Sequence, residues 1–275
     1  MEPLIAVKDL DIAFLQQGVR THVVKDISFD IFPQEVLAIV GESGSGKSVT
    51  ALSIMRLLPP PPYCTIMGTI TYEQLNVLKL TEKQLRKIRG AGVAYVFQEP
   101  STSFNPVFTI GYQIAEAIRL HLADVEDVKA YAIQLLCKVG LDGQHCYGAY
   151  PHELSGGMQQ RAMIAMALAC RPRVLIADEP TTALDATIQK QIIELLKHLQ
   201  RTEKLTIVLI THNFGIVRHF AQRVIVMSRG KIVEQGLSEQ IVMHPQHPYT
   251  QALIACIPTL GQRKERLKTI DYSAF

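Results

Sequence analysis

The octapeptide GESGSGKS, at residues 41–48 of this 275-residue chain, constrains the fold more than any other stretch of the sequence. Its glycines let the backbone curl so that successive N–H groups face a phosphate, and its lysine can reach the same phosphate. Five apolar residues, VLAIV at 36–40, come directly before it, and a helical stretch follows. A buried strand, a glycine-rich turn and a helix in this order predict a nucleotide site at a sheet edge.

This loop and a second strand end supply the candidate ligands. Lys47 is expected to bind the β and γ phosphates, and the Ser48 hydroxyl to bind Mg²⁺. The expected binding residues of the loop are Gly41, Ser43, Gly44, Ser45, Gly46, Lys47, Ser48 and Val49. The apolar run at 174–177 ends in Asp178 and Glu179. The first carboxylate can hold Mg²⁺, and the second is suited to act as general base for an attacking water.

The apolar pattern predicts both antiparallel and buried parallel strands. Residues 23–32 alternate apolar and polar side chains, and residues 5–14 are expected to pair with them across a polar stretch at 16–22. Continuous apolar runs, which are typical of strands buried on both faces, occur at Val93–Phe97, Val174–Ala177 and Ile207–Ile210. The segment GKIVEQG after residue 229 is expected to return as a hairpin.

Between about residues 105 and 172 the apolar spacing becomes helical. One stripe has the spacing i, i+4, i+8 and comprises Ile110, Ile114 and Ile118; a second comprises Ala132, Leu135, Leu136 and Val139. The segment therefore reads as a small helical subdomain inserted between two strands. The Pro/His-rich stretch HPQHPYTQAL, at 244–253, favours a turn before a short helix.

Composition excludes several classes of protein. The chain has 28 Lys and Arg against 25 Asp and Glu, so its formal charge of +3 gives no strongly basic face for nucleic acid. Its longest wholly apolar run, Met163–Cys170, is much shorter than the about twenty residues of a membrane-spanning helix. The 5 cysteines are odd in number and lack a Cys-x-x-Cys pair, which favours free thiols. With no secretory signal pattern at its start, the chain is expected to be globular and cytosolic.

Six motifs in a fixed order resemble those of the ATP-binding cassette (ABC) ATPases. They are GESGSGKS at 41–48, Gln98 in YVFQEP, LSGGM at 154–158, VLIADE at 174–179, TALD at 182–185 and His212 in ITHN. The resemblance covers residues 5 to about 240. It implies a RecA-like P-loop core with an N-terminal antiparallel β subdomain, an inserted helical subdomain and a short C-terminal extension. The implied domains are an ATPase domain at 1–240, with its helical subdomain at about 105–172, and an extension at 241–275.

The resemblance also implies roles for single residues. Two cassettes pack head to tail, so that ATP lies between one P-loop and the partner's Ser155, Gly156 and Gly157. Gln98 senses Mg²⁺ and water, which makes Ser48, Gln98 and Asp178 the implied Mg²⁺ ligands. Glu179, His212 and Gln98 are the implied catalytic residues, with His212 contacting the γ-phosphate, and Asp185 orders the dimer interface.

Two positions depart from the family pattern. Met158 replaces the glutamine of the LSGGQ signature, which removes one polar side chain and leaves the backbone donors in place. The aromatic residue that stacks on adenine has no clear counterpart. Alignment puts Gly18 there, with Phe14 and His22 as substitutes.

Two further segments are similar to those of the peptide and nickel importer ATPases. They are EPSTSFNP at 99–106 and HPYTQAL at 247–253. This resemblance implies a subunit that hydrolyses ATP to drive import of di- or oligopeptides or nickel. It also implies a second, different ATPase chain, two transmembrane permease subunits and an extracytoplasmic solute-binding protein. The chain itself is expected on the cytoplasmic face of the plasma membrane. Only Cys256 lies in the tail region, so no iron–sulfur cluster is expected, and the basic run at 263–268 reads as solvated.

Three alternatives stay open at this point. Nickel remains possible as cargo beside peptides. The chain is alternatively a nucleotide-gated regulatory module, which the presence of Glu179, His212 and Ser155 disfavours. A non-transport ABC ATPase acting on nucleic acid is disfavoured by the weak charge and by the presence of a single cassette.

Overall fold

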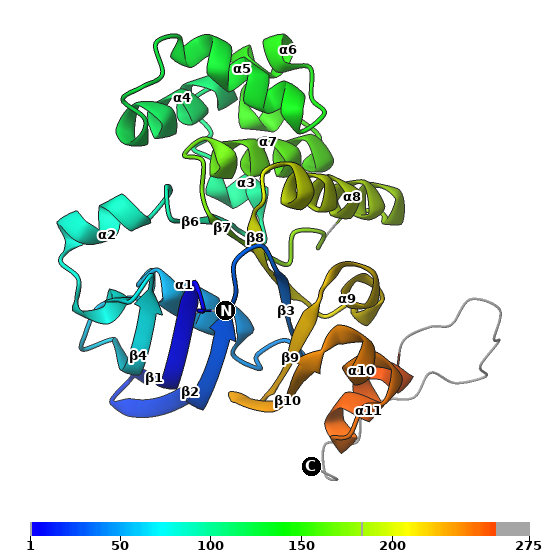
Figure 1. Ribbon diagram of the computed structural model, residues 1–275. Helices are drawn as coiled ribbons and strands as arrows, with labels where there is room; N and C mark the ends of the chain where they lie inside the picture. Colours follow the sequence, from blue (N-terminus) through cyan, green and yellow to red (C-terminus); the bar gives the residue numbers. More distant parts are fainter. Residues whose placement is uncertain (1, 183, 257–275) are drawn as a thin grey trace. The chain divides into compact units, whose positions relative to one another are not determined.

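The computed structural model describes residues 2–182 and 184–256. The chain forms two compact units (Figure 1). The first comprises Met1–Lys79 and Val208–Phe275, and the second comprises Leu80–Ile207. The basic run at 263–268 and most of the C-terminal extension lie outside the described residues, as does Ala183 of the TALD motif.

An antiparallel sheet forms the N-terminal part of the first unit (blue to cyan in Figure 1). Its strands lie in the order β2-β1-β4-β5, with bounds β1 Ile5–Gln16, β2 Val19–Ile31, β4 Cys64–Tyr72 and β5 Leu75–Asn76. The predicted alternation is confirmed, because Ile27, Phe29 and Ile31 are buried.

The prediction of a polar connection at 16–22 is wrong. Strand β1 continues to Gln16, which pairs with Val19 at the start of β2. Only Gln17 and Gly18 form the turn, with φ values of 49° and 78°. Positive φ at both central residues is what a tight two-residue hairpin needs. The strand ends are exposed, so they carry no apolar alternation that would reveal them.

A second group of strands in the first unit carries the predicted glycine-rich loop. Strands β10, β9, β3 and β8 lie in this order, with bounds β3 Val36–Val40, β8 Thr206–Thr211, β9 Arg223–Ser228 and β10 Lys231–Leu237. The first unit contains β8 from Val208 onward. Strand β3 is buried throughout and runs parallel to β9, while β10 returns antiparallel as the predicted hairpin. The helices of this unit are α1 Lys47–Ile54, the one-turn η1 Val77–Lys79, α9 Phe214–Phe220, α10 Ser238–Met243 and α11 Pro248–Ala255.

The second unit contains two buried parallel strands and a set of helices. Strands β6 (Val93–Val96) and β7 (Val174–Asp178) pair in parallel. The helices are α2 Glu82–Ile88, α3 Pro100–Ser103, α4 Ile110–His121, α5 Val128–Lys138, α6 Gly143–Gly148, η2 Pro151–Glu153, α7 Gly156–Leu168 and α8 Ala186–Thr202. Both predicted apolar stripes, on α4 and on α5 with Val139 after it, are buried. The expected α/β fold with a helical subdomain is therefore confirmed.

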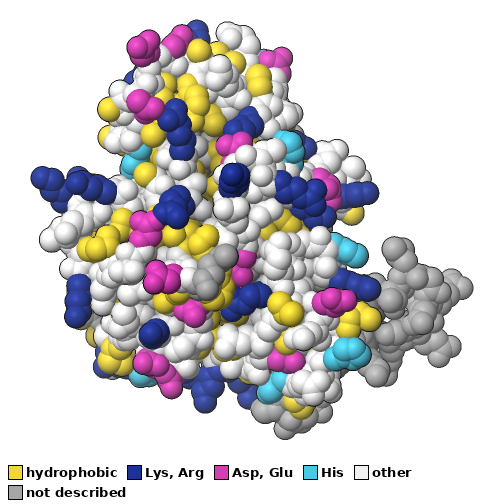
Figure 2. Space-filling model, viewed as in Figure 1, with side chains coloured by type: hydrophobic (Ala, Val, Ile, Leu, Met, Phe, Trp, Pro, Cys, Tyr) yellow, Lys and Arg dark blue, Asp and Glu magenta, His cyan; other side chains and the backbone are white. Residues whose placement is uncertain are grey.

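The distribution of surface charge and the state of the cysteines agree with what the composition predicts. On the face drawn in Figure 2, Lys and Arg side chains are interspersed with Asp and Glu. All five cysteines are free thiols. Across the two described ranges, no helix combines the length and the apolar character needed to cross a membrane.

Candidate nucleotide-binding site

The predicted phosphate loop connects β3 to α1 in the first unit. Gly46 precedes α1 with a left-handed φ of 101°, and an added Cβ there would lie 3.0 Å from the Val23 carbonyl oxygen of β2. At Gly41 an added Cβ would overlap the Met227 carbonyl oxygen at the end of β9. The loop therefore passes so close to two strands that glycine is required at both positions.

Lys47 lies inside the curl of this loop. Its side chain is 5% exposed, and its Nζ donates to the carbonyl oxygens of Gly41 at 2.9 Å and Glu42 at 2.7 Å. Burying an ammonium is costly unless hydrogen bonds compensate it, and these two carbonyls provide that compensation. The result is a fixed positive charge at the N-terminal end of α1.

The loop fits a phosphate group. Ser45 Oγ is buried and has no hydrogen-bond partner in the structure. A buried hydroxyl without a partner is uncommon in folded proteins, and an anion in the loop would accept a hydrogen bond from it. Gly44 faces open space with a φ of 78°. Together with Lys47, these features match the requirements of a di- or triphosphate.

Asp178 ends β7 in the second unit. The carboxylate is 5% exposed, and Tyr95 of the neighbouring strand β6 donates its phenol proton to Asp178 Oδ2 at 2.7 Å. Burial and the adjacent carboxylate both raise the pKa of Tyr95, so its phenol stays protonated and remains a donor. One oxygen of Asp178 is thereby oriented by its neighbour in the sheet.

Glu179 follows with a left-handed φ of 44°. Its Oε2 accepts a hydrogen bond from Thr182 Oγ1 at 2.8 Å. Gln98 Nε2 lies 3.5 Å from the same oxygen, at the outer limit of a hydrogen bond. The structure thus brings together three predicted residues, Gln98, Asp178 and Glu179, at the ends of β6 and β7.

A second group of predicted residues lies where helices α7 and α8 begin. Ser155 caps α7, its Oγ accepting from Met158 N at 3.4 Å. Asp185 caps α8, its Oδ1 accepting from Thr187 N and Ile188 N, each at 3.0 Å. The two helices touch here, since an added Cβ on Gly157 would lie 2.8 Å from Ile188 Cγ2.

The remaining predicted residues lie in the first unit. Ser48 and Val49 belong to the first turn of α1, and His212 follows β8 with an exposed side chain. Of the adenine candidates, Gly18 is in the hairpin turn, whereas Phe14 and His22 lie on adjacent strands. His22 Nδ1 is 2.8 Å from Asp11 Oδ1.

Three residues near these sites were not predicted from the sequence, namely Tyr95, Thr182 and Tyr249. A tyrosine inside a buried apolar strand needs a partner for its hydroxyl, and this signal could have identified Tyr95. Tyr249 lies 207 residues from Glu42, whose backbone N–H donates to its Oη at 3.2 Å. No local pattern signals a contact between such distant positions.

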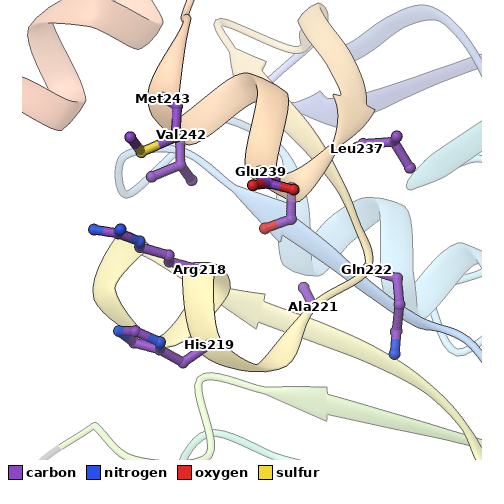
Figure 3. Close-up of a pocket in the computed structure, with 9 residues that line it drawn as sticks. Arg218, His219, Ala221, Gln222, Leu237, Glu239, Val242 and Met243 are labelled. Atoms are coloured by element: carbon purple, nitrogen blue, oxygen red, sulfur yellow. The ribbon is translucent and has the colours of Figure 1, made fainter.

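A separate groove of about 620 Å³ opens between α9 and α10 in the first unit (Figure 3). Its lining mixes Arg218 and Glu239 with the exposed Met243. Ser238 is buried there, but its hydroxyl already donates to the Val217 carbonyl at 3.2 Å. In the described residues, none of the buried polar atoms that lack a partner lines this groove, so it does not repeat the phosphate-binding arrangement.

Comparison with known proteins agrees with this geometry. A family model described as "ABC transporter" matches residues 24–182. A second, "Oligopeptide/dipeptide transporter, C-terminal region", matches residues 233–274. The chain is similar to solved cassettes, including the dimeric post-hydrolysis state of the ATP-binding cassette MJ0796 bound to ADP and Pi. That structure has a TM-score of 0.76 and 27% identity, covering 85% of this chain and 98% of that one. The cbiO1 cassette from Clostridium perfringens has a TM-score of 0.75 and 27% identity, covering 89% and 92%.

Curated relatives are more similar in sequence. The "Peptidoglycan transport ATP-binding protein YejF" of Agrobacterium fabrum is 51% identical over 94% of this chain and 47% of its own length. The "Glutathione import ATP-binding protein GsiA" of Shigella dysenteriae is 50% identical over 98% of this chain and 44% of its own length. The chain therefore spans about half the length of the curated relatives it matches.

Proposed function

The chain belongs to the ABC transporter family, within its peptide/nickel importer group, and from this premise we propose that it is the ATP-hydrolysing subunit of a peptide importer. The single observation that carries the proposal is the loop at 41–48, where a buried lysine lies beside a buried serine hydroxyl that has no hydrogen-bond partner among the described residues. Peptides are favoured over nickel because the relatives' names and the C-terminal family model refer to glutathione, peptidoglycan and oligopeptides.

We assign the binding of ATP to the loop and to α1. The Lys47 ammonium and backbone N–H groups at the start of α1 bind the phosphates, and the partial positive charge of the helix end adds to their attraction. Ser48, Gln98 and Asp178 are the side chains that would hold Mg²⁺. When bound, this ion neutralises charge that develops on the phosphate oxygens.

We assign proton abstraction to Glu179. Thr182 and Gln98 both approach Oε2 and orient the carboxylate, which would accept the proton of an attacking water. His212 is the residue proposed to orient that water and contact the γ-phosphate.

We propose that Ser155, Gly156 and Gly157 bind the γ-phosphate held by a second cassette. The proposal is supported by their position at the N-terminus of the 13-residue helix α7, where free N–H groups and the helix dipole favour an anion. Asp185, which begins the adjoining helix α8, would order the same interface. A different ATPase chain is the expected partner.

The other proposed partners are two transmembrane permease subunits and, indirectly, an extracytoplasmic solute-binding protein. This assignment places the chain on the cytoplasmic face of the plasma membrane. It is supported by the printed descriptions of the relatives as import and transport ATP-binding proteins.

Peptide uptake by cells that carry the complete transport system tests this function. Lys47→Ala is expected to abolish uptake of a radiolabelled tripeptide, because the loop loses its only buried ammonium among the described residues. Lys83→Ala, at an exposed position of α2, is the matched control and should leave uptake unchanged. Undiminished peptide uptake by Lys47→Ala, or uptake of ⁶³Ni²⁺ with no uptake of peptide, would contradict the proposal.

A further inference from the structure

The C-terminal helix α11 places a tyrosine hydroxyl against the phosphate loop. Tyr249 is 2% exposed, and its Oη accepts a hydrogen bond from the Glu42 backbone N–H at 3.2 Å. Glu42 lies between the strand β3 and the helix α1, so this N–H takes part neither in the hydrogen bonds of the sheet nor in those of the helix. The phenol is therefore the acceptor that satisfies it in the structure.

The segment that carries Tyr249 is itself held firmly. The backbone N–H of Tyr249 donates to Nδ1 of His247, the residue that caps α11, at 3.1 Å. Upstream, the two carboxylate oxygens of Glu234 on β10 accept from Gln246 N at 2.8 Å and His247 N at 3.1 Å. The start of α11 is thus tied to strand β10, and the phenol has a fixed position.

The same peptide unit is bound at its other end by the phosphate-binding lysine. The Glu42 N–H and the Gly41 carbonyl belong to one planar amide group. The carbonyl oxygen accepts from Lys47 Nζ at 2.9 Å while the N–H donates to Tyr249. Rotation of this amide plane would break both bonds, so the phenol and the ammonium together fix its orientation.

The phenol remains neutral in this setting. Burial is the main cause that raises the pKa of Tyr249 above its ordinary value, so no phenolate forms near neutral pH. The Ser228 side chain at the end of β9 hydrogen-bonds the same hydroxyl. Gly230, in the turn after β9, donates its N–H to the Ser45 carbonyl at 3.1 Å, so this turn and α11 both contact the loop.

We propose that Tyr249 is a positioning residue of the nucleotide site, holding the Gly41–Glu42 amide so that Lys47 points into the loop. The inference rests on the proposed function of that loop. Without the hydroxyl the Glu42 N–H loses the bond to Tyr249, and the loop spends part of its time in other conformations. The apparent dissociation constant for nucleotide rises in proportion as the competent fraction falls.

The test uses Tyr249→Phe, which removes one oxygen and keeps the ring in its packed position. Titration calorimetry of the full chain with MgADP should give about three- to tenfold weaker binding, as expected for one lost hydrogen bond. Hydrogen exchange of the Glu42 amide should become faster by a similar factor. The melting temperature reports any general loss of stability separately.

Two further variants make the result decisive. Tyr131→Phe, which removes a hydroxyl bonded to Arg171 in the second unit, should change neither the MgADP affinity nor exchange at Glu42. Lys47→Ala should lose MgADP binding, and its failure to do so would refute the loop's function rather than this inference. Unchanged affinity in Tyr249→Phe, or weaker affinity without faster exchange at Glu42, overturns the role proposed for Tyr249.

Discussion

At the scale of single residues, the proposed base is defined by the side chains that hold it. Glu179 has an uncommon left-handed backbone conformation, and Thr182 donates to its Oε2 at 2.8 Å. A hydrogen bond to a charged group stabilises by about 1.5–3 kcal/mol, enough to select one rotamer of the carboxylate. Glu179 could be identified from the sequence because it follows a buried strand. The contact of Thr182 with Glu179 could not, because it depends on the conformation of the turn between them.

Thr182→Val is expected to slow ATP turnover about ten- to a hundredfold, because the carboxylate loses the bond that orients it. The variant keeps the side chain's size, and the KM for ATP should not change since Thr182 is not expected to touch the nucleotide. Steady-state kinetics of the assembled transporter measures both quantities. Thr182→Ser keeps the hydroxyl and should restore the rate; a Ser variant as slow as Val would show that the hydroxyl does not orient Glu179.

At the scale of elements, local patterns predicted more than contacts between elements. The strand at 36–40, its loop and α1 were predictable since the chain itself joins them in order. The apolar stripe of α4 was predictable for the same reason, because Ile110, Ile114 and Ile118 recur at one helical spacing and are buried. The contact between the starts of α7 and α8 could not be predicted from the sequence, because it depends on side-chain packing rather than on periodicity.

Gly157→Ala tests this contact between α7 and α8. An added Cβ would lie 2.8 Å from Ile188 Cγ2, closer than packed side chains come, so the helices must shift. We expect a loss of about 1–3 kcal/mol in the free energy of unfolding.

The neighbouring glycine is the matched control. At Gly156 an added Cβ would lie 3.6 Å from Leu184 Cδ2, an ordinary contact, so Gly156→Ala should be neutral or slightly stabilising. Urea denaturation of both variants gives the comparison. Equal stability of the two would contradict the packing of α7 against α8.

At the scale of the whole molecule, the predicted residues divide between the two units. The loop at 41–48 and His212 belong to the first unit, whereas Gln98, Glu179 and Ser155 belong to the second. The order of motifs along the chain predicted the α/β fold and the family. The contact of Tyr249 with the loop was not predictable, since 207 residues separate it from Glu42.

Gly156→Asp tests the proposed association of two cassettes. The position has room for a Cβ, so the chain should fold, but a carboxylate there would repel the γ-phosphate held by the partner. Sedimentation with MgATP and the partner cassette should show loss of the ATP-dependent complex, while nucleotide binding to the loop at 41–48 is unchanged. Gly156→Ala should still associate. An ATP-dependent complex of normal affinity in Gly156→Asp would rule out this interface.

Release of inorganic phosphate from MgATP tests whether this chain hydrolyses ATP with Glu179 as the base. The measurement compares the wild-type and Glu179→Gln chains, each assembled with the subunits that co-purify with it. Glu179→Gln is expected to bind ATP as tightly as the wild type but to release phosphate about 10²–10⁴-fold more slowly. Phosphate release by Glu179→Gln at the wild-type rate would show that Glu179 is not the base.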